Sequence, residues 1–275
     1  MKAIVLTCDK YHPFAEHMIQ CYEDLWPDHP FGFRIPYESD RGNFEQKFGR
    51  KVELKHVPPP ANGSSHIRHT VLNLLEDLDE EMVYWALDDK YPVQIHRKFK
   101  KLTSWVQNRC PQGVDGISAS RRCLSGDIVQ KKAEKTKDIP LVRREDYAGI
   151  WIHQFLRVRA LRELFSSFPN RPFSAKEMDG FKDSFTLPID TRFYGSMYTY
   201  VVFGESTTRG HITRNCYDSM VQKGIPVPTG FGIKDIYYEI GSIHLKICGI
   251  PVPYWFITPV KRFFTSLEKT LRQRK

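Results

Sequence analysis

Residues 82–92, MVYWALDDKYP, decide the fold class of this chain. The first six letters form an unbroken apolar run, which is typical of a central strand that is covered on both faces. The run ends abruptly at Asp88 and Asp89. In open α/β sheets ligands bind at the carboxyl ends of the strands. The two aspartates are therefore the first candidate site.

The segments around this run alternate between strand and helix patterns. Strand patterns occur at 2–8, 31–37, 52–57 and 114–120, and helix patterns occur at 14–26, 65–78 and 93–106. Such alternation predicts an α/β fold with a mixed, largely parallel central sheet flanked by helices. Ser65 is the expected cap of the helix that precedes the apolar run.

The second half alternates less regularly between strand and helix patterns. It predicts a strand at 150–158, a helix at 159–168, a short helix at 174–185, a strand at 196–203 and a polar loop at 204–214. No repeat or low-complexity linker separates it from the first half. We therefore expect one domain over residues 1–260 and a basic amphipathic tail at 261–275.

Charge and composition limit the function classes. The 275 residues carry 41 Lys and Arg against 32 Asp and Glu, a net charge of +9, and 41% are hydrophobic, which excludes a disordered chain. Residues 121–144 hold 8 basic and 3 acidic side chains, and residues 261–275 hold 6 and 1, so each segment has a net +5. Basic segments on a neutral body indicate an anionic partner such as phosphate, nucleic acid or a membrane surface.

The cysteines and the hydropathy indicate the compartment. Six cysteines without a CxxC pair favour reduced thiols over a zinc site or a disulfide scaffold. No apolar run of about 18 residues occurs. We expect a cytoplasmic protein whose tail at 261–275 contacts the inner face of an anionic membrane.

Asp88 and Asp89 indicate metal chemistry. Two adjacent carboxylates after a buried strand are costly unless their charge is compensated. Mn²⁺ or Mg²⁺ would do this, because both favour carboxylate and phosphate oxygens, and either ion would also neutralise a diphosphate leaving group. The alternative is a polar turn in which Asp88 caps a helix.

The stretch WALDDKY, residues 85–91, resembles the DxD-type metal motif of GT-A glycosyltransferases. The stretch VLTCDKY, residues 5–11, resembles the first strand and nucleotide-contacting loop of that family. The resemblance covers about residues 1–120 and implies a GT-A-like fold and a nucleotide-diphosphate sugar as donor. It implies Asp89 as metal ligand and Asp88 as a second ligand or sugar contact, although the sequence reads DD where the family has D-x-D.

Other residues then become candidates for donor binding. Thr7 and Asp9 follow the first strand and suit hydrogen bonds to ribose or base, and Arg68 precedes the motif strand. Arg209 would pair with the diphosphate in a loop that closes over it, and His211 would be a third metal ligand. For each of them a surface or turn role is the alternative.

The half 121–260 is expected to bind a glycan or lipid-linked acceptor. An inverting transfer needs a base that takes the proton of the acceptor hydroxyl, and Glu177 and Asp179 are the candidates. Tyr91 is a further candidate for packing against a sugar ring. Two other functions stay open: a basic nucleic-acid-binding protein without catalysis, and a sugar nucleotidyltransferase, which also holds metal with paired carboxylates.

Overall fold

The computed structural model describes residues 1–61, 63–109, 112–120, 134–136, 139–144, 150–184, 192–196, 199–240, 244–247 and 250–253. None of their helices is long and apolar enough to cross a bilayer. The predicted tail at 261–275 lies outside the described residues, as does most of the basic segment 121–144.

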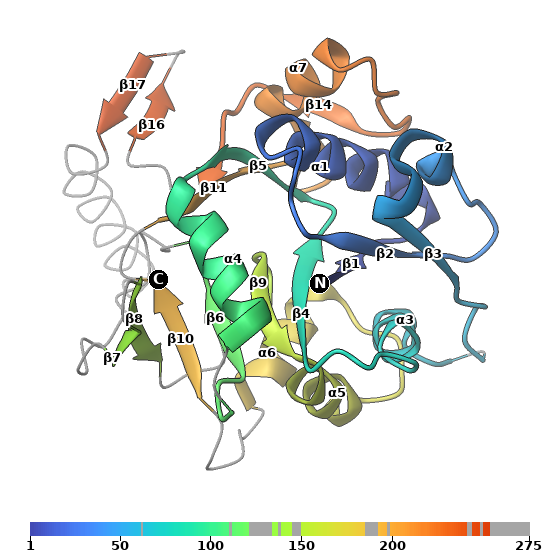
Figure 1. The fold of residues 1–275 in the computed structure, drawn as a ribbon. Coiled ribbons are helices and arrows are strands. Elements are labelled where there is room, and N and C mark those ends of the chain that lie inside the picture. Colours follow the sequence, from blue (N-terminus) through green and yellow to red (C-terminus); the bar gives the residue numbers. More distant parts are fainter. Residues whose placement is uncertain are drawn as a thin grey trace, which may run out of the picture.

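A nine-stranded sheet forms the centre of the fold (Figure 1). Its strands follow the order β3 (Val52–His56), β2 (Gly32–Tyr37), β1 (Lys2–Leu6), β4 (Met82–Leu87), β9 (Gln154–Arg157), β6 (Gly116–Ser118), β10 (Phe193–Ser196), β8 (Ile139–Arg144) and β7 (Glu134–Thr136). The pairings make β9 and β8 run against the other seven. The predicted α/β class with a mixed, largely parallel sheet is confirmed.

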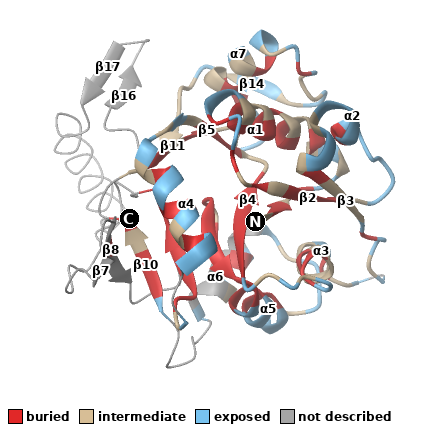
Figure 2. Cartoon of the chain, viewed as in Figure 1, coloured by how far each residue is buried: buried red, intermediate tan, exposed pale blue. Residues whose placement is uncertain are grey.

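Helices cover both faces of this sheet. Successive side chains of a strand point to opposite faces. On β4, Met82, Tyr84 and Ala86 join one apolar cluster with α1 (His12–Leu25) and α4 (Arg97–Arg109). Val83, Trp85 and Leu87 join a second cluster with α3 (His66–Leu74), α5 (Val158–Ser167) and α6 (Ala175–Ser184). All six residues of β4 are buried, as its unbroken apolar run predicts (Figure 2).

Smaller elements complete the chain. A three-stranded sheet has the order β15 (Glu239–Ile240), β11 (Val201–Glu205) and β5 (Lys90–Ile95), and another has the order β12 (Thr207–Thr208), β13 (His211–Thr213) and β14 (Gly232–Lys234). β16 (His244–Ile247) pairs with β17 (Ile250–Pro253). The remaining helices are α2 (Phe44–Phe48) and α7 (Arg214–Gln222), with 3₁₀ turns at Asp9–Tyr11 and Gly49–Lys51.

Three predicted boundaries were wrong. The helix expected over 93–106 begins only at Arg97, because residues 90–95 form strand β5. The strand expected over 196–203 divides into β10 and β11. The polar loop expected over 204–214 contains the hairpin β12–β13.

Candidate functional site

The ends of β1 and β4 bring the two halves of the predicted site together. These strands are parallel neighbours with Leu6 beside Leu87. The Asp88 amide then donates to the carbonyl oxygen of Leu6, at 3.3 Å. The Thr7 hydroxyl, which donates to the Cys8 carbonyl oxygen at 3.4 Å, lies close enough to the Asp88 carboxyl to lower its pKa. Thr7, Asp88 and Asp89 therefore lie at one carboxyl edge of the sheet, as expected.

Asp88 has an unusual electrostatic environment. Its lost hydration, reinforced by the negative charge of Asp89, raises the pKa of Asp88 from 3.8 to about 8. The Thr7 hydroxyl and the Lys90 ammonium oppose this shift without cancelling it. A carboxyl group that resists ionisation is stabilised in its charged form by a bound cation. A cation bound next to Asp88 would therefore favour its ionised form.

Tyr11 and Cys8 belong to the same strand end, although the sequence did not single them out. Burial, and then the charge of Asp88, raises the pKa of both side chains. The Tyr11 ring lies edge-on to Phe231, with 5.7 Å between ring centroids. The signal for these residues is their position in the loop that directly follows β1. They place a thiol and an aromatic ring beside the aspartate pair.

Lys90 binds two carboxylates at the start of β5. Its amino group lies 2.7 Å from Asp89 Oδ2 and 3.1 Å from Glu205 Oε1, and the residue is 4% exposed. Glu205 is its direct cross-strand partner, since β5 and β11 pair with Lys90 opposite Glu205. Burial alone would lower the pKa of Lys90, but Asp89 and Glu205 outweigh burial and raise it. Lys90 is therefore a buried cation that is fixed beside Asp89.

Tyr91, the neighbour of Lys90, lies in the core. The residue is 2% exposed, and its ring lies 4.5 Å from the ring of His17. A Cβ atom built on Gly204 would meet the Tyr91 ring at 2.3 Å. The ring is thus enclosed by His17 and by the backbone of β11. The expected packing of Tyr91 against a sugar was wrong, because the ring faces protein.

Asp9 orders a neighbouring loop. Its carboxylate accepts hydrogen bonds from the amides of Glu38, Ser39 and Asp40, at 2.8–2.9 Å, and from the Ser39 hydroxyl. Partial burial would raise the pKa of Asp9, but these donors outweigh it and lower the pKa to about 2. Four donors occupy the acceptor positions of a carboxylate. Asp9 therefore holds residues 38–40 at the edge of the sheet, where a contact to ribose was expected.

Arg68 lies in the first turn of α3, which follows β3. The predicted cap is present, since the Ser65 hydroxyl accepts from the Arg68 amide at 3.3 Å. The Nε atom of Arg68 is buried and makes no hydrogen bond within the described part of the chain. A buried donor without a partner is uncommon in folded proteins. The Nε–H group of Arg68 is therefore an unpaired hydrogen-bond donor within the described part of the chain, and a role in binding a nucleotide sugar stays a prediction.

Arg209 lies in the tight turn of the β12–β13 hairpin, and His211 directly follows this turn. Arg209 and Gly210 have φ angles of 51° and 78°, the left-handed pair that a two-residue hairpin turn requires. His211 Nδ1 lies 3.1 Å from the carbonyl oxygen of Arg209. In the ranges the structure describes, no three His, Cys, Asp or Glu side chains are placed to share an ion. His211 thus does not complete a three-ligand set with Asp88 and Asp89.

Glu177 forms a helix cap. Its carboxylate accepts from the amide and the hydroxyl of Ser174, while the Ser174 hydroxyl accepts from the Glu177 amide, which is a capping box. Arg171 adds an ion pair at 3.1 Å. The Ser174 amide and hydroxyl, and then Arg171, lower the pKa of Glu177, which weakens it as a base. Asp179 lies on the same helix α6, and its side chain is outside the described part.

A buried polar chain supports the end of β4 from behind. His153 Nε2 lies 2.9 Å from the carbonyl oxygen of Leu87, and its Nδ1 lies 3.0 Å from the Tyr22 hydroxyl. Tyr22 is in turn 2.7 Å from the Tyr84 hydroxyl. Burial lowers the pKa of His153 to about 3, so the ring is neutral. Because a carbonyl only accepts, Nε2 carries the hydrogen, Tyr22 donates to Nδ1, and Tyr84 donates to Tyr22.

The central position of Tyr22 in this chain predicts unequal effects of two matched substitutions. Tyr22→Phe removes the central hydroxyl and leaves His153 Nδ1 and the Tyr84 hydroxyl unpaired, which should cost about 2–3 kcal/mol. Tyr84→Phe removes only the terminal donor and should cost about 1 kcal/mol. Urea unfolding of both variants measures the difference. Equal losses would contradict the central position of the Tyr22 hydroxyl in this chain of hydrogen bonds.

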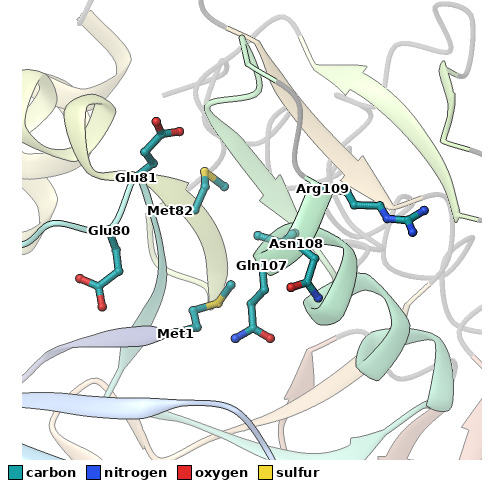
Figure 3. A pocket seen from close by; sticks show the side chains of 8 residues that line it. Met1, Glu80, Glu81, Met82, Gln107, Asn108 and Arg109 are labelled. Atoms are coloured by element: carbon teal, nitrogen blue, oxygen red, sulfur yellow. The ribbon is translucent and has the colours of Figure 1, made fainter.

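The described residues also line a pocket at the opposite edge of the sheet (Figure 3). Its volume is about 510 Å³, and its walls come from Met1, from the start of β4 with Glu80 and Glu81, and from the end of α4. These are the amino ends of β1 and β4. Asp88 and Asp89 do not line it. Since ligands of such sheets bind at the carboxyl ends, we do not place the donor in this pocket.

Comparisons with known proteins give structural likenesses only. No family model matches the chain, and no curated protein matches it. The chain is similar to the galactosyltransferase LgtC in complex with donor and acceptor sugar analogues, with 13% identity, a TM-score of 0.40, and 80% of this chain and 78% of LgtC covered.

Two further solved structures are similar to the chain. S. aureus TarS 1–349 in complex with UDP-GlcNAc has 14% identity, a TM-score of 0.46, and 80% of this chain and 64% of TarS 1–349 covered. HddC from Yersinia pseudotuberculosis has 11% identity, a TM-score of 0.46, and 81% of this chain and 99% of HddC covered. Since the three TM-scores lie below 0.5, the function has to be argued from the residues of this chain.

Proposed function

We propose that this chain is a glycosyltransferase that moves a sugar from a nucleotide-diphosphate sugar to a glycan or lipid-linked acceptor. The observation that carries the proposal is the aspartate pair at the carboxyl end of the buried central strand β4. Thr7 and Tyr11, at the end of the parallel neighbour β1, lie beside this pair. This edge is where α/β sheets bind nucleotides.

The residues at this edge fit a divalent cation that is shared with a donor. Mg²⁺ is commonly held by one or two carboxylates together with substrate phosphates, and Mn²⁺ also takes carboxylate oxygens. Asp89 and Asp88 would be the protein ligands. A bound ion supplies Lewis-acid stabilisation of the departing nucleoside diphosphate.

The other side chains would bind and orient the donor. Thr7 and the Tyr11 ring would hold the nucleoside, and the free Nε of Arg68 would meet a phosphate or base. Arg209 lies at the tip of the hairpin, and its pairing with the diphosphate stays a prediction. For an inverting transfer the base also stays a prediction. Of its two candidates, Glu177 is occupied as a helix cap, so Asp179 is the first to test.

A thermal-shift panel tests the proposal. UDP-, GDP-, CMP- and dTDP-sugars are compared with and without Mn²⁺. A donor at about 100 times its Kd stabilises the native state by about 2.7 kcal/mol, which raises Tm by roughly 5–10 °C for a chain of this size. The stabilising donor is then incubated with glycan acceptors. Release of a nucleoside diphosphate supports the proposal.

Two outcomes would overturn it. Release of pyrophosphate from a sugar phosphate and a nucleoside triphosphate would make the chain a nucleotidyltransferase. Salt-dependent binding of nucleic acid, without any shift by a nucleotide sugar, would favour a binding protein.

A further inference from the structure

Lys90 already occupies the side of Asp89 that faces Glu205. Its ammonium lies 2.7 Å from one oxygen of Asp89 and 3.1 Å from one oxygen of Glu205. The Lys90 side chain is 5% exposed, whereas those of Asp89 and Glu205 are 34% and 23% exposed. The cation is therefore buried beneath two carboxylates that reach the surface.

The backbone fixes this arrangement. Lys90 and Glu205 are directly opposite in the antiparallel pair of β5 and β11. The Ser206 amide donates to the carbonyl oxygen of Asp89 at 2.7 Å, which ties the end of β4 to the end of β11. From this fixed backbone position the ammonium contacts both carboxylates. Opposite charges at such a position stabilise the strand pair.

A divalent cation that binds Asp89 meets this ammonium. One oxygen of Asp89 is shared with Lys90, and the ammonium repels a second cation at close range. Asp88 and Asp89 are then the available protein ligands, since the described residues offer no group of three. Oxygens that are missing from the coordination shell have to come from water or from the donor's phosphates.

We propose that Lys90 makes metal binding depend on the donor. As long as no diphosphate is present, the Lys90 ammonium neutralises the negative charges of Asp89 and Glu205. This inference rests on the proposed function. The empty site holds a divalent cation weakly, and the negative charge of a bound diphosphate offsets the repulsion. Lys90 is a positioning residue, since it acts through Asp89.

Mn²⁺ binding without nucleotide tests this role and needs no turnover. The free Mn²⁺ signal in electron paramagnetic resonance gives Kd for the wild type, Lys90→Met and Lys90→Arg. We expect Lys90→Met to bind Mn²⁺ at least about tenfold more tightly, because it releases two carboxylates from their cation. Lys90→Arg keeps the charge and should stay as weak as the wild type.

Two further variants locate the effect. Glu205→Gln leaves Lys90 with Asp89 as its only anionic partner, so its affinity for Mn²⁺ should not exceed that of the wild type. Asp89→Asn in the Lys90→Met background should remove the gain. If Lys90→Met does not fold, the double variant Lys90→Met with Glu205→Gln avoids leaving a glutamate without its cation. This double variant should still bind Mn²⁺ more tightly than Glu205→Gln alone.

Two results would overturn the proposal. One is a wild type that binds Mn²⁺ as tightly as Lys90→Met. The other is a gain that survives Asp89→Asn. Neither depends on a donor, so a failure here differs from a failure of the thermal-shift panel, which would remove the proposed function itself.

Discussion

An Asp89→Asn variant is expected to lower kcat by about 10²–10³-fold with the donor and acceptor that the wild type uses. Asparagine has nearly the same shape, and its amide oxygen still accepts a hydrogen bond from Lys90. The substitution therefore removes the negative charge and keeps the fold. Loss of one electrostatic contact that acts in the transition state has an effect of this size.

The measurement is kcat at saturating donor and Mn²⁺, together with Tm as a check of the fold. Asp79→Asn is the matched control, because Asp79 is an exposed aspartate that precedes β4 at the opposite end of the strand. The control should keep wild-type kcat. An Asp89→Asn enzyme with more than about half of wild-type kcat would contradict the assignment of Asp89 to the reaction centre.

The central strand was predictable because its burial on both faces is visible in the local sequence. β4 is buried on both faces, so every residue has to be apolar, and MVYWAL shows this directly. The same pattern predicted where the strand ends, at Asp88. The neighbouring strand followed from the β-rich run 2–8, of which residues 2–6 form β1. The core of the candidate site was therefore visible in two short segments.

Strand β5 was missed because its local sequence does not distinguish a strand from a helix. The stretch KYPVQI contains Pro92, which argues against a central strand. β5 lies at the edge of its own three-stranded sheet, where a proline is tolerated. The helix pattern of residues 97–109 follows at once, so the two merged into one predicted helix. Only the pairing with β11, more than 100 residues away, decides the assignment.

Separation along the chain also hid the partners of two charged site residues. Asp9 binds amides of residues 38–40, which lie 29–31 positions away, and Lys90 meets Glu205 across 115 positions. Neither pairing has a local signal. Glu177 is a different case, because Ser174 and Glu177 have the spacing S-x-x-E that marks a capping box. That role was readable from the sequence, although the residue was assigned as a base.

An Asp88→Asn variant is expected to be more stable than the wild type at pH 8 without metal. The pKa of Asp88 is about 8 in the folded chain, against 3.8 for an unperturbed group. Between these values the native state retains a proton that the unfolded chain has released. The free energy of unfolding of the wild type therefore falls as pH rises from about 4 to 8, and stays low above it.

Asparagine removes this penalty, because it cannot ionise. One pKa unit corresponds to about 1.36 kcal/mol, so the full shift sets an upper bound of about 6 kcal/mol, and we expect about 2–3 kcal/mol because a half-buried carboxyl keeps part of its hydration. Urea unfolding at pH 4.5 and pH 8 in the presence of a chelator measures the difference. The two proteins should agree at pH 4.5 and separate at pH 8.

The same variant links stability to function. An ion or a donor complex at this edge favours ionised Asp88, so saturating Mn²⁺ with a donor should flatten the pH dependence of the wild type and leave that of Asp88→Asn unchanged. Stabilisation by removal of a charged group is expected where an active site holds that charge for binding. A variant that is less stable than the wild type at pH 8 would show that the Asp88 carboxylate supports the fold, and the unfavourable burial inferred for it would be wrong.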